Sequence, residues 1–150
     1  MVERGYHHPE PIGTVNDPLL LDNVQQVRFS GNNYYAAHMR NLGMMALAMD
    51  EADDTEHQLH NYLNTAIGAH LYIFDHLTRT DSRGGLLPEG LEYSPQTLGY
   101  ATQFLLSLHT AGASYPISSS LSSNPFWNES LSAYLHSLSP ATVARQEGGD

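Results

Sequence analysis

Hydrophobic positions recur every three to four residues along most of the chain, which is the periodicity of an amphipathic helix. The pattern is longest in residues 50–80, where it continues for about five turns. Thr55 is the expected N-cap of this helix, and acidic residues crowd its first turn, where the helix dipole favours them. The predicted buried face consists of Leu59, Tyr62, Leu63, Ala66, Ile67, His70, Ile73, Phe74 and Leu77.

Residues 32–50 predict a second helix, with Asn32 or Asn33 as its N-cap. Gly43 lies inside this helix, where glycine costs about 1 kcal/mol relative to alanine. We therefore expect Gly43 to mark close packing against another helix. The expected apolar stripe consists of Tyr34, Ala37, Met44, Met45, Leu47 and Ala48.

Two more helices are predicted in the second half of the chain. In residues 94–112, Ser94 is the expected cap, Pro95 takes the first helical position, and Gly112 ends the helix. Its core face would be Leu98, Ala101, Leu105 and Leu108. Residues 124–140 predict a shorter helix whose inward side chains are Phe126, Trp127, Leu131, Tyr134, Leu135 and Leu138.

The resulting class is all-α, because no segment has a convincing strand pattern. Residues 1–30, rich in proline near the start, predict an irregular lead-in with room for one short helical turn. Residues 31–138 predict a domain of antiparallel helical hairpins, and residues 139–150 a flexible tail. Wide apolar faces and the lack of a final capping element indicate an excerpt of a larger helical array. A small four-helix bundle is the alternative.

Charge and composition limit the classes of partner that the chain is expected to bind. Sixteen acidic residues against six basic ones give a formal charge of −10, which argues against nucleic acid and anionic membranes. There is no cysteine and no apolar run long enough to span a bilayer. The chain contains no glycine-rich phosphate loop, and we expect no cofactor and no metal. No signal peptide is visible, and the compartment stays open.

Residues 80–97, TDSRGGLLPEGLEYSPQT, form an unusually long connection between two predicted helices. Glu89, Glu92, Tyr93 and Arg83 could supply an acid, a base and a charge clamp. The alternative is a slack, solvated loop whose glutamates serve only solubility.

A second polar cluster opens the helix at residue 32. Tyr34 and His38 are one turn apart on the same face, so with Asn32 and Asn33 they could line a cleft that binds sugar hydroxyls. In the alternative interpretation the asparagines are caps and the tyrosines are core residues.

The two clusters, GNNYYAAHMRNLGMMALAMD and RGGLLPEGLEYSPQTLGYATQFLLSLH, resemble the (α/α)-toroid carbohydrate-active proteins. The similarity covers about residues 30–110 and is nearest to the heparinase II/III-like and alginate-lyase-like polysaccharide lyases. The resemblance implies that Asn32 or Asn33 neutralises a uronate carboxylate. Glu89 would match the family's loop glutamate, and Tyr93 its proton-shuttling tyrosine. The chain lacks the family's serine directly after that glutamate, and His38 does not stand where the family's histidine does.

The resemblance thus predicts a polysaccharide- or oligosaccharide-binding cleft, with cleavage by β-elimination as one activity and further helical hairpins of a longer parent chain as structural partners. The predicted catalytic residues are Tyr93, Glu89 and His38, and the predicted substrate-binding residues are Asn32, Asn33, Tyr34, Arg83 and Glu92. A hydrolase would instead pair Glu89 with Glu92 or Asp81. The competing hypothesis is a non-catalytic helical scaffold or interaction module, and convergence of Asn33, Glu89 and Tyr93 on one concave face would favour the first.

Overall fold

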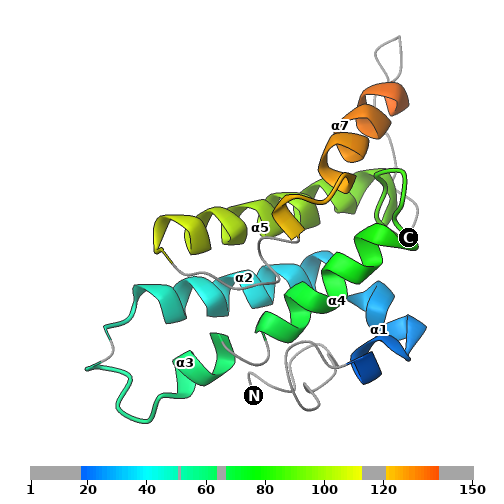
Figure 1. Ribbon diagram of the computed structural model, residues 1–150. Helices are drawn as coiled ribbons and strands as arrows, with labels where there is room; N and C mark the ends of the chain where they lie inside the picture. The colour runs from blue at the N-terminus through cyan, green and yellow to red at the C-terminus, as the bar shows by residue number, and fades with distance from the viewer. Residues whose placement is uncertain (1–17, 51, 64–66, 113–120, 139–150) are drawn as a thin grey trace.

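A computed structural model describes residues 18–50, 52–63, 67–112 and 121–138. Helices account for the regular structure, and the residues so described contain no strand, which confirms the all-α prediction (Figure 1). The elements are a 3₁₀ helix η2 (Pro18–Leu21), α1 (Val24–Phe29), α2 (Asn33–Ala48), α3 (Gln58–Tyr62), α4 (Gly68–Arg79), α5 (Gly90–Thr110) and α7 (Phe126–Ser137). None of the helices in these ranges is long and apolar enough to cross a membrane.

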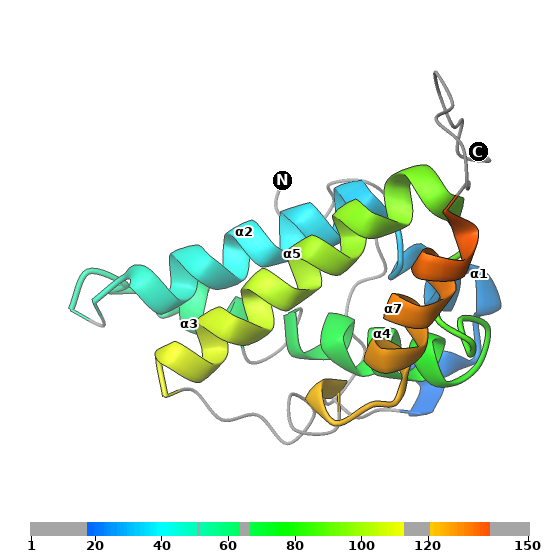
Figure 2. The ribbon, with the colours of Figure 1, turned by 90° about the horizontal axis from the view of Figure 1, so that it is seen from above.

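The two longest helices, α2 and α5, lie side by side and run parallel (Figures 1 and 2). Arg40 Nη1 on α2 donates to Gln103 Oε1 on α5 at 2.6 Å. Close packing at Gly43 is confirmed, because a Cβ there would lie 2.2 Å from the ring of Phe104. The first turns of α2 and α5 therefore meet at one end of the molecule.

Helix α4 runs in the opposite direction beneath this pair. Tyr35, in the first turn of α2, packs edge-on against His70 near the start of α4, whereas Gly31 before α2 lies against Leu77 near the end of α4. The chain therefore runs back along α4 after α2, before α5 resumes the direction of α2.

The core is centred on α4, most of which is buried. The predicted buried face of residues 50–80 is confirmed at Leu63, Ile67, His70, Ile73, Phe74 and Leu77, while Leu59 and Tyr62 are half-buried. Ala66 lies outside the described residues. Two helices, α3 and α4, occupy this stretch. Helix α3 begins three residues after Thr55, the predicted N-cap. Asp54 Oδ1, rather than Thr55, accepts a hydrogen bond from Leu59 N at 3.3 Å.

The predicted inner face of α2 is wrong by about one residue. Tyr34, Met44 and Met45 are 60 %, 42 % and 55 % exposed. The buried side chains instead follow the spacing i, i+4, i+7, i+11 at Tyr35, Met39, Leu42 and Ala46. In the doublets Tyr34–Tyr35 and Met44–Met45, two neighbouring faces of the helix carry the same residue type. Hydropathy alone therefore did not show which of the two faces is buried.

The prediction that the leucines of the last helix face inward is also wrong. Leu131, Leu135 and Leu138 are exposed, whereas Phe126 is buried. Helix α7 packs through Ser130 instead, whose hydroxyl donates to the carbonyl of Gly85 at 2.6 Å. A serine lets the backbone of α7 approach the loop more closely than a leucine would. Helix α7 therefore packs on its serine side, and its leucines face solvent.

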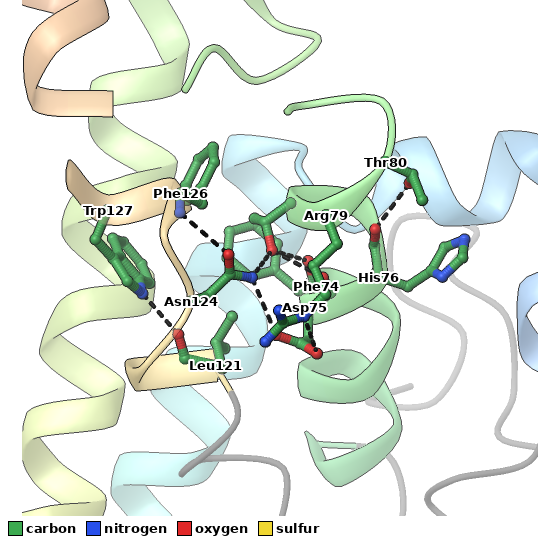
Figure 3. Close-up of polar contacts among 10 residues, drawn as sticks. Phe74, Asp75, His76, Arg79, Thr80, Leu121, Asn124, Phe126 and Trp127 are labelled. Carbon is green, nitrogen blue, oxygen red and sulfur yellow. Dashed lines mark hydrogen bonds and ion pairs between the residues drawn. The ribbon is translucent and has the colours of Figure 1, made fainter. Parts of the chain in front are cut away.

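A buried polar network fixes the turn before α7 to α4 (Figure 3). Asn124 Nδ2 donates to Asp75 Oδ1 at 3.1 Å and to Thr78 Oγ1 at 2.8 Å, and Asn124 Oδ1 accepts from Phe126 N at 3.1 Å. Arg79 Nε donates to the other oxygen of Asp75 at 3.0 Å. The buried polar side chains of this network, Asp75, Thr78 and Asn124, therefore all have partners, as burial requires.

Candidate functional site

The connection after α4 is shorter than predicted, because α5 begins at Gly90 rather than at Pro95. Ser94, the predicted cap, lies inside the helix, and its hydroxyl donates to Leu87 O at 3.2 Å. Gly90 has φ +73°, a conformation that favours glycine and sets the turn into the helix. Pro95 is exposed in the second turn of α5 and lacks the N–H that would bond to Leu91 O.

The remaining loop, residues 80–89, is tied along its length rather than slack. Arg28 Nε on α1 donates to Asp81 Oδ2 at 2.6 Å. Gly84 N donates to Glu129 Oε2 on α7 at 3.0 Å, and Gly85 has no room for a side chain, since a Cβ would lie 2.4 Å from the backbone of Glu129. The loop is therefore held between α1 and α7.

Glu89, at the end of the loop, attaches it to the start of α2. Its Oε1 accepts from Asn32 Nδ2 and its Oε2 from Asn33 N, both at 2.7 Å. The hydroxyl of Thr97 on α5 lies 3.4 Å from Oε2 and 3.2 Å from Gly31 O. A carboxylate at a helix N-terminus is favoured by the helix dipole and by the N–H groups that lack partners there. Glu89 thus joins the first turns of α2 and α5.

Asn32 is the N-cap of α2, as predicted. Its Oδ1 accepts from Tyr34 N and Tyr35 N at 3.1 and 3.2 Å, while its Nδ2 is the donor to Glu89. The side chain of Asn33 is buried, and its Nδ2 is 3.4 Å from Gln96 Oε1 on α5. Both asparagines are therefore committed to the helix start.

The environment of Glu89 has opposing effects on its ionisation. Burial raises the pKa of the Glu89 carboxyl, while the hydrogen bonds from Asn33 N, Thr97 and Asn32 lower it. The net pKa lies above its ordinary value, so desolvation outweighs the three donors.

These residues border a pocket of about 470 Å³, here called the loop pocket. Figure 1 shows α1 and the first turns of α2 and α5 gathered at the same end of the molecule. The pocket is lined by Gln25, Arg28 and Phe29 of α1, by Asn32, Asn33 and Tyr34 at the start of α2, and by Pro88, Glu89 and Tyr93 of the loop and α5. Phenyl and phenol rings therefore share one hollow with amide, carboxylate and guanidinium groups.

The predicted site residues divide into two groups. The loop pocket brings together Asn32, Asn33, Tyr34, Glu89 and Tyr93. The others are not among its lining residues: His38 is half-buried one turn further along α2, Arg83 is exposed in the loop, and Glu92 is exposed in the first turn of α5. In the described ranges, no three or more histidine, aspartate or glutamate side chains gather as metal ligands would.

Sequence reasoning missed the contribution of α1, because residues 1–30 were predicted to be largely irregular. Helix α1 spans only Val24–Phe29, too short for periodicity to reveal. One signal was present. Asn23 is a typical N-cap residue, and its Oδ1 accepts from Gln25 N at 3.1 Å and from Gln26 N at 3.3 Å.

Comparison with known proteins found no matching family model, no matching curated protein and no matching solved structure. The likeness to the (α/α)-toroid proteins therefore stays a prediction from the residues.

Proposed function

We propose that the chain binds a saccharide in the loop pocket and does not by itself cleave it. The observation that carries the proposal is the convergence of Phe29, Tyr34 and Tyr93 with Glu89 and Arg28 in one open hollow. Ligand sites typically combine apolar and aromatic walls with a few well-placed polar groups.

The chemistry of a sugar suits these walls. The C–H faces of a pyranose ring pack against aromatic rings, and tyrosine adds a hydroxyl that donates and accepts. Tyr34 is mostly exposed and Tyr93 partly so, so both are accessible to a ligand. A carboxylate has about four acceptor positions, of which the protein contacts of Glu89 use three, so one is available to a sugar hydroxyl.

The contacts of the asparagines support binding over β-elimination. A lyase needs a group that neutralises the uronate carboxylate, the role that the resemblance assigned to Asn32 or Asn33. Both ends of the Asn32 amide are engaged, and Asn33 is buried against Gln96. Glu89 would add a negative charge beside the substrate's own carboxylate. We therefore favour a neutral saccharide.

Glycosidase activity has even less support. Hydrolysis of a glycosidic bond normally uses two carboxyl groups on either side of the bond. Among the described residues that line the loop pocket, Glu89 is the one acidic side chain. Asp81 is paired with Arg28, and Glu92 does not line the pocket.

The packing of α2 and α5 supports a place in a longer helical array. Neighbouring helices of an up-and-down four-helix bundle run antiparallel. Here α2 and α5 are neighbours and run parallel, as equivalent helices of successive stacked hairpins do. We therefore retain the partial (α/α) toroid as the proposed parent architecture.

Calorimetric titration of the full chain with cellohexaose, xylohexaose, maltohexaose and an alginate hexamer tests the proposal. We expect at least one neutral sugar to bind, and Tyr34→Ala to weaken it about tenfold, an ordinary loss for an aromatic contact. Tyr100→Ala, a tyrosine on α5 outside the pocket, is the matched control and should leave the affinity unchanged. If no sugar binds, or if both variants lose affinity equally, the proposal fails.

The same samples separate binding from cleavage. We expect the alginate hexamer to remain intact, with no absorbance from an unsaturated uronate. Appearance of that absorbance, and its loss in Tyr93→Phe, would restore the lyase hypothesis.

A further inference from the structure

A second hollow lies on the opposite half of α2 from the loop pocket. It has a volume of about 490 Å³ and is formed between the C-terminal half of α2 and residues 53–62. We call it the Met45 groove, and it is lined by Leu42, Met45, Asp53, Asp54, Thr55, Glu56, Gln58, Leu59 and Tyr62. Its walls therefore combine apolar side chains from both segments with several carboxylates.

The floor of the Met45 groove is apolar and accessible. Met45 is 55 % exposed, whereas Leu59 and Tyr62 are half-buried at the edge of the core. Methionine is flexible and polarizable, and exposed methionines are frequent on surfaces that bind partner helices. Burial of the exposed part of Met45 would add to the stability of a complex.

The rim of the groove is negative. Asp53 and Glu56 are exposed on its lining, and residues 50–56 contain five acidic side chains and no basic one. Asp54 has a structural role, because it is buried and accepts from Leu59 N. Helix α2 also ends here with no basic residue in its last turn, so the negative end of its dipole has no nearby cation on that turn.

From these observations we infer that the Met45 groove docks a basic amphipathic helix of a partner protein. The apolar side of such a helix would cover Met45, Leu59 and Tyr62, and its lysines or arginines would meet Asp53 and Glu56. Complementary charge would set the orientation and speed the association. A second copy of this chain fits poorly, because each copy carries a formal charge of −10.

The test uses the full chain and a labelled peptide of about 18 residues, five helical turns, with leucine on one side and lysine on the other. Fluorescence anisotropy measures binding. Two control peptides are matched to it: one replaces every lysine by glutamate, and the other has the same composition in an order without helical periodicity.

Three variants locate the contact. Met45→Gln should weaken binding about tenfold, since it places an uncharged polar group on the apolar floor. Asp53→Asn combined with Glu56→Gln should also weaken it about tenfold and flatten its salt dependence. Leu131→Glu changes an exposed leucine of α7, which is not part of the groove, and should have no effect.

The double variant alters only exposed side chains, so it tests the inference even if Met45→Gln disturbs the fold. The inference is wrong if the basic peptide does not bind the full chain, or if either control peptide binds as well. It is equally wrong if the double variant binds as tightly as the parent, or if Leu131→Glu causes the larger loss.

Discussion

Removing the Glu89 carboxylate should destabilise the fold by separating the loop from the start of α2. Glu89→Ala deletes two hydrogen bonds of 2.7 Å, to Asn32 Nδ2 and Asn33 N. Hydrogen bonds to a charged acceptor contribute about 1.5–3 kcal/mol each. Burial of the ionised carboxylate, which raises the pKa of Glu89, offsets part of the stabilisation that these hydrogen bonds provide. We therefore expect a net loss of about 2–3 kcal/mol.

Urea unfolding followed by circular dichroism measures this loss, with Glu92→Ala as the matched control. Glu92 also lies in the first turn of α5 but is exposed, so its removal should cost less than about 1 kcal/mol. A loss of 2–3 kcal/mol corresponds to a fall in melting temperature of about 4–12 °C for a chain of 150 residues. Equal losses in the two variants would refute the argument that Glu89 holds the loop to α2.

The other predictions concern the loop, the polar network and pH. Gly84→Ala and Gly85→Ala both force alanine to positive φ, but only the Cβ at position 85 meets the backbone of α7. Urea unfolding should therefore show that Gly85→Ala costs about 2 kcal/mol more stability than Gly84→Ala. Equal costs would contradict the close packing of Gly85 against α7. Asn124→Ala should cost about 2–4 kcal/mol by stranding buried polar groups, whereas the exposed Asn128→Ala should stay within about 0.5 kcal/mol. Because the pKa of Glu89 is raised in the folded state, the pH-dependent part of its stabilising contribution is complete below its ordinary pKa of 4.5 and declines as the pH rises through the folded value. The destabilisation by Glu89→Ala should therefore be larger at acidic than at neutral pH, and the opposite trend would contradict this assignment.

The parts of the fold that the sequence predicted well are those with long, unambiguous periodicity. The stripe that ends in α4 identified its core residues, since each turn of that segment places an apolar side chain on the same side. Gly43 was also informative, because a glycine inside a helix loses stability unless another element, here Phe104, needs the space.

The errors have physical causes as well. Doublets such as Met44–Met45 give two helix faces the same hydropathy, so only packing decided which one is buried. Helix α7 was predicted to use its leucines, but its contact depends on Ser130 and the absence of a side chain at Gly85. Such backbone contacts leave no periodic trace in a sequence.

The candidate site was predicted in part for a similar reason. Asn32 is a strong capping residue, and a glutamate in a glycine-rich loop is a natural partner for a helix start, so their meeting could be expected. The contribution of α1 could not, because Arg28 and Phe29 reach the pocket through tertiary packing of a six-residue helix.

NMR titration of the isotope-labelled full chain with the best-binding neutral hexasaccharide shows whether a saccharide occupies the loop pocket. We expect chemical-shift changes at the amides of Gln25, Arg28, Tyr34 and Tyr93 and at the side-chain amide of Asn32, with little change in α7. Changes confined to α7 or to the Met45 groove, or no change at saturating sugar, would contradict it.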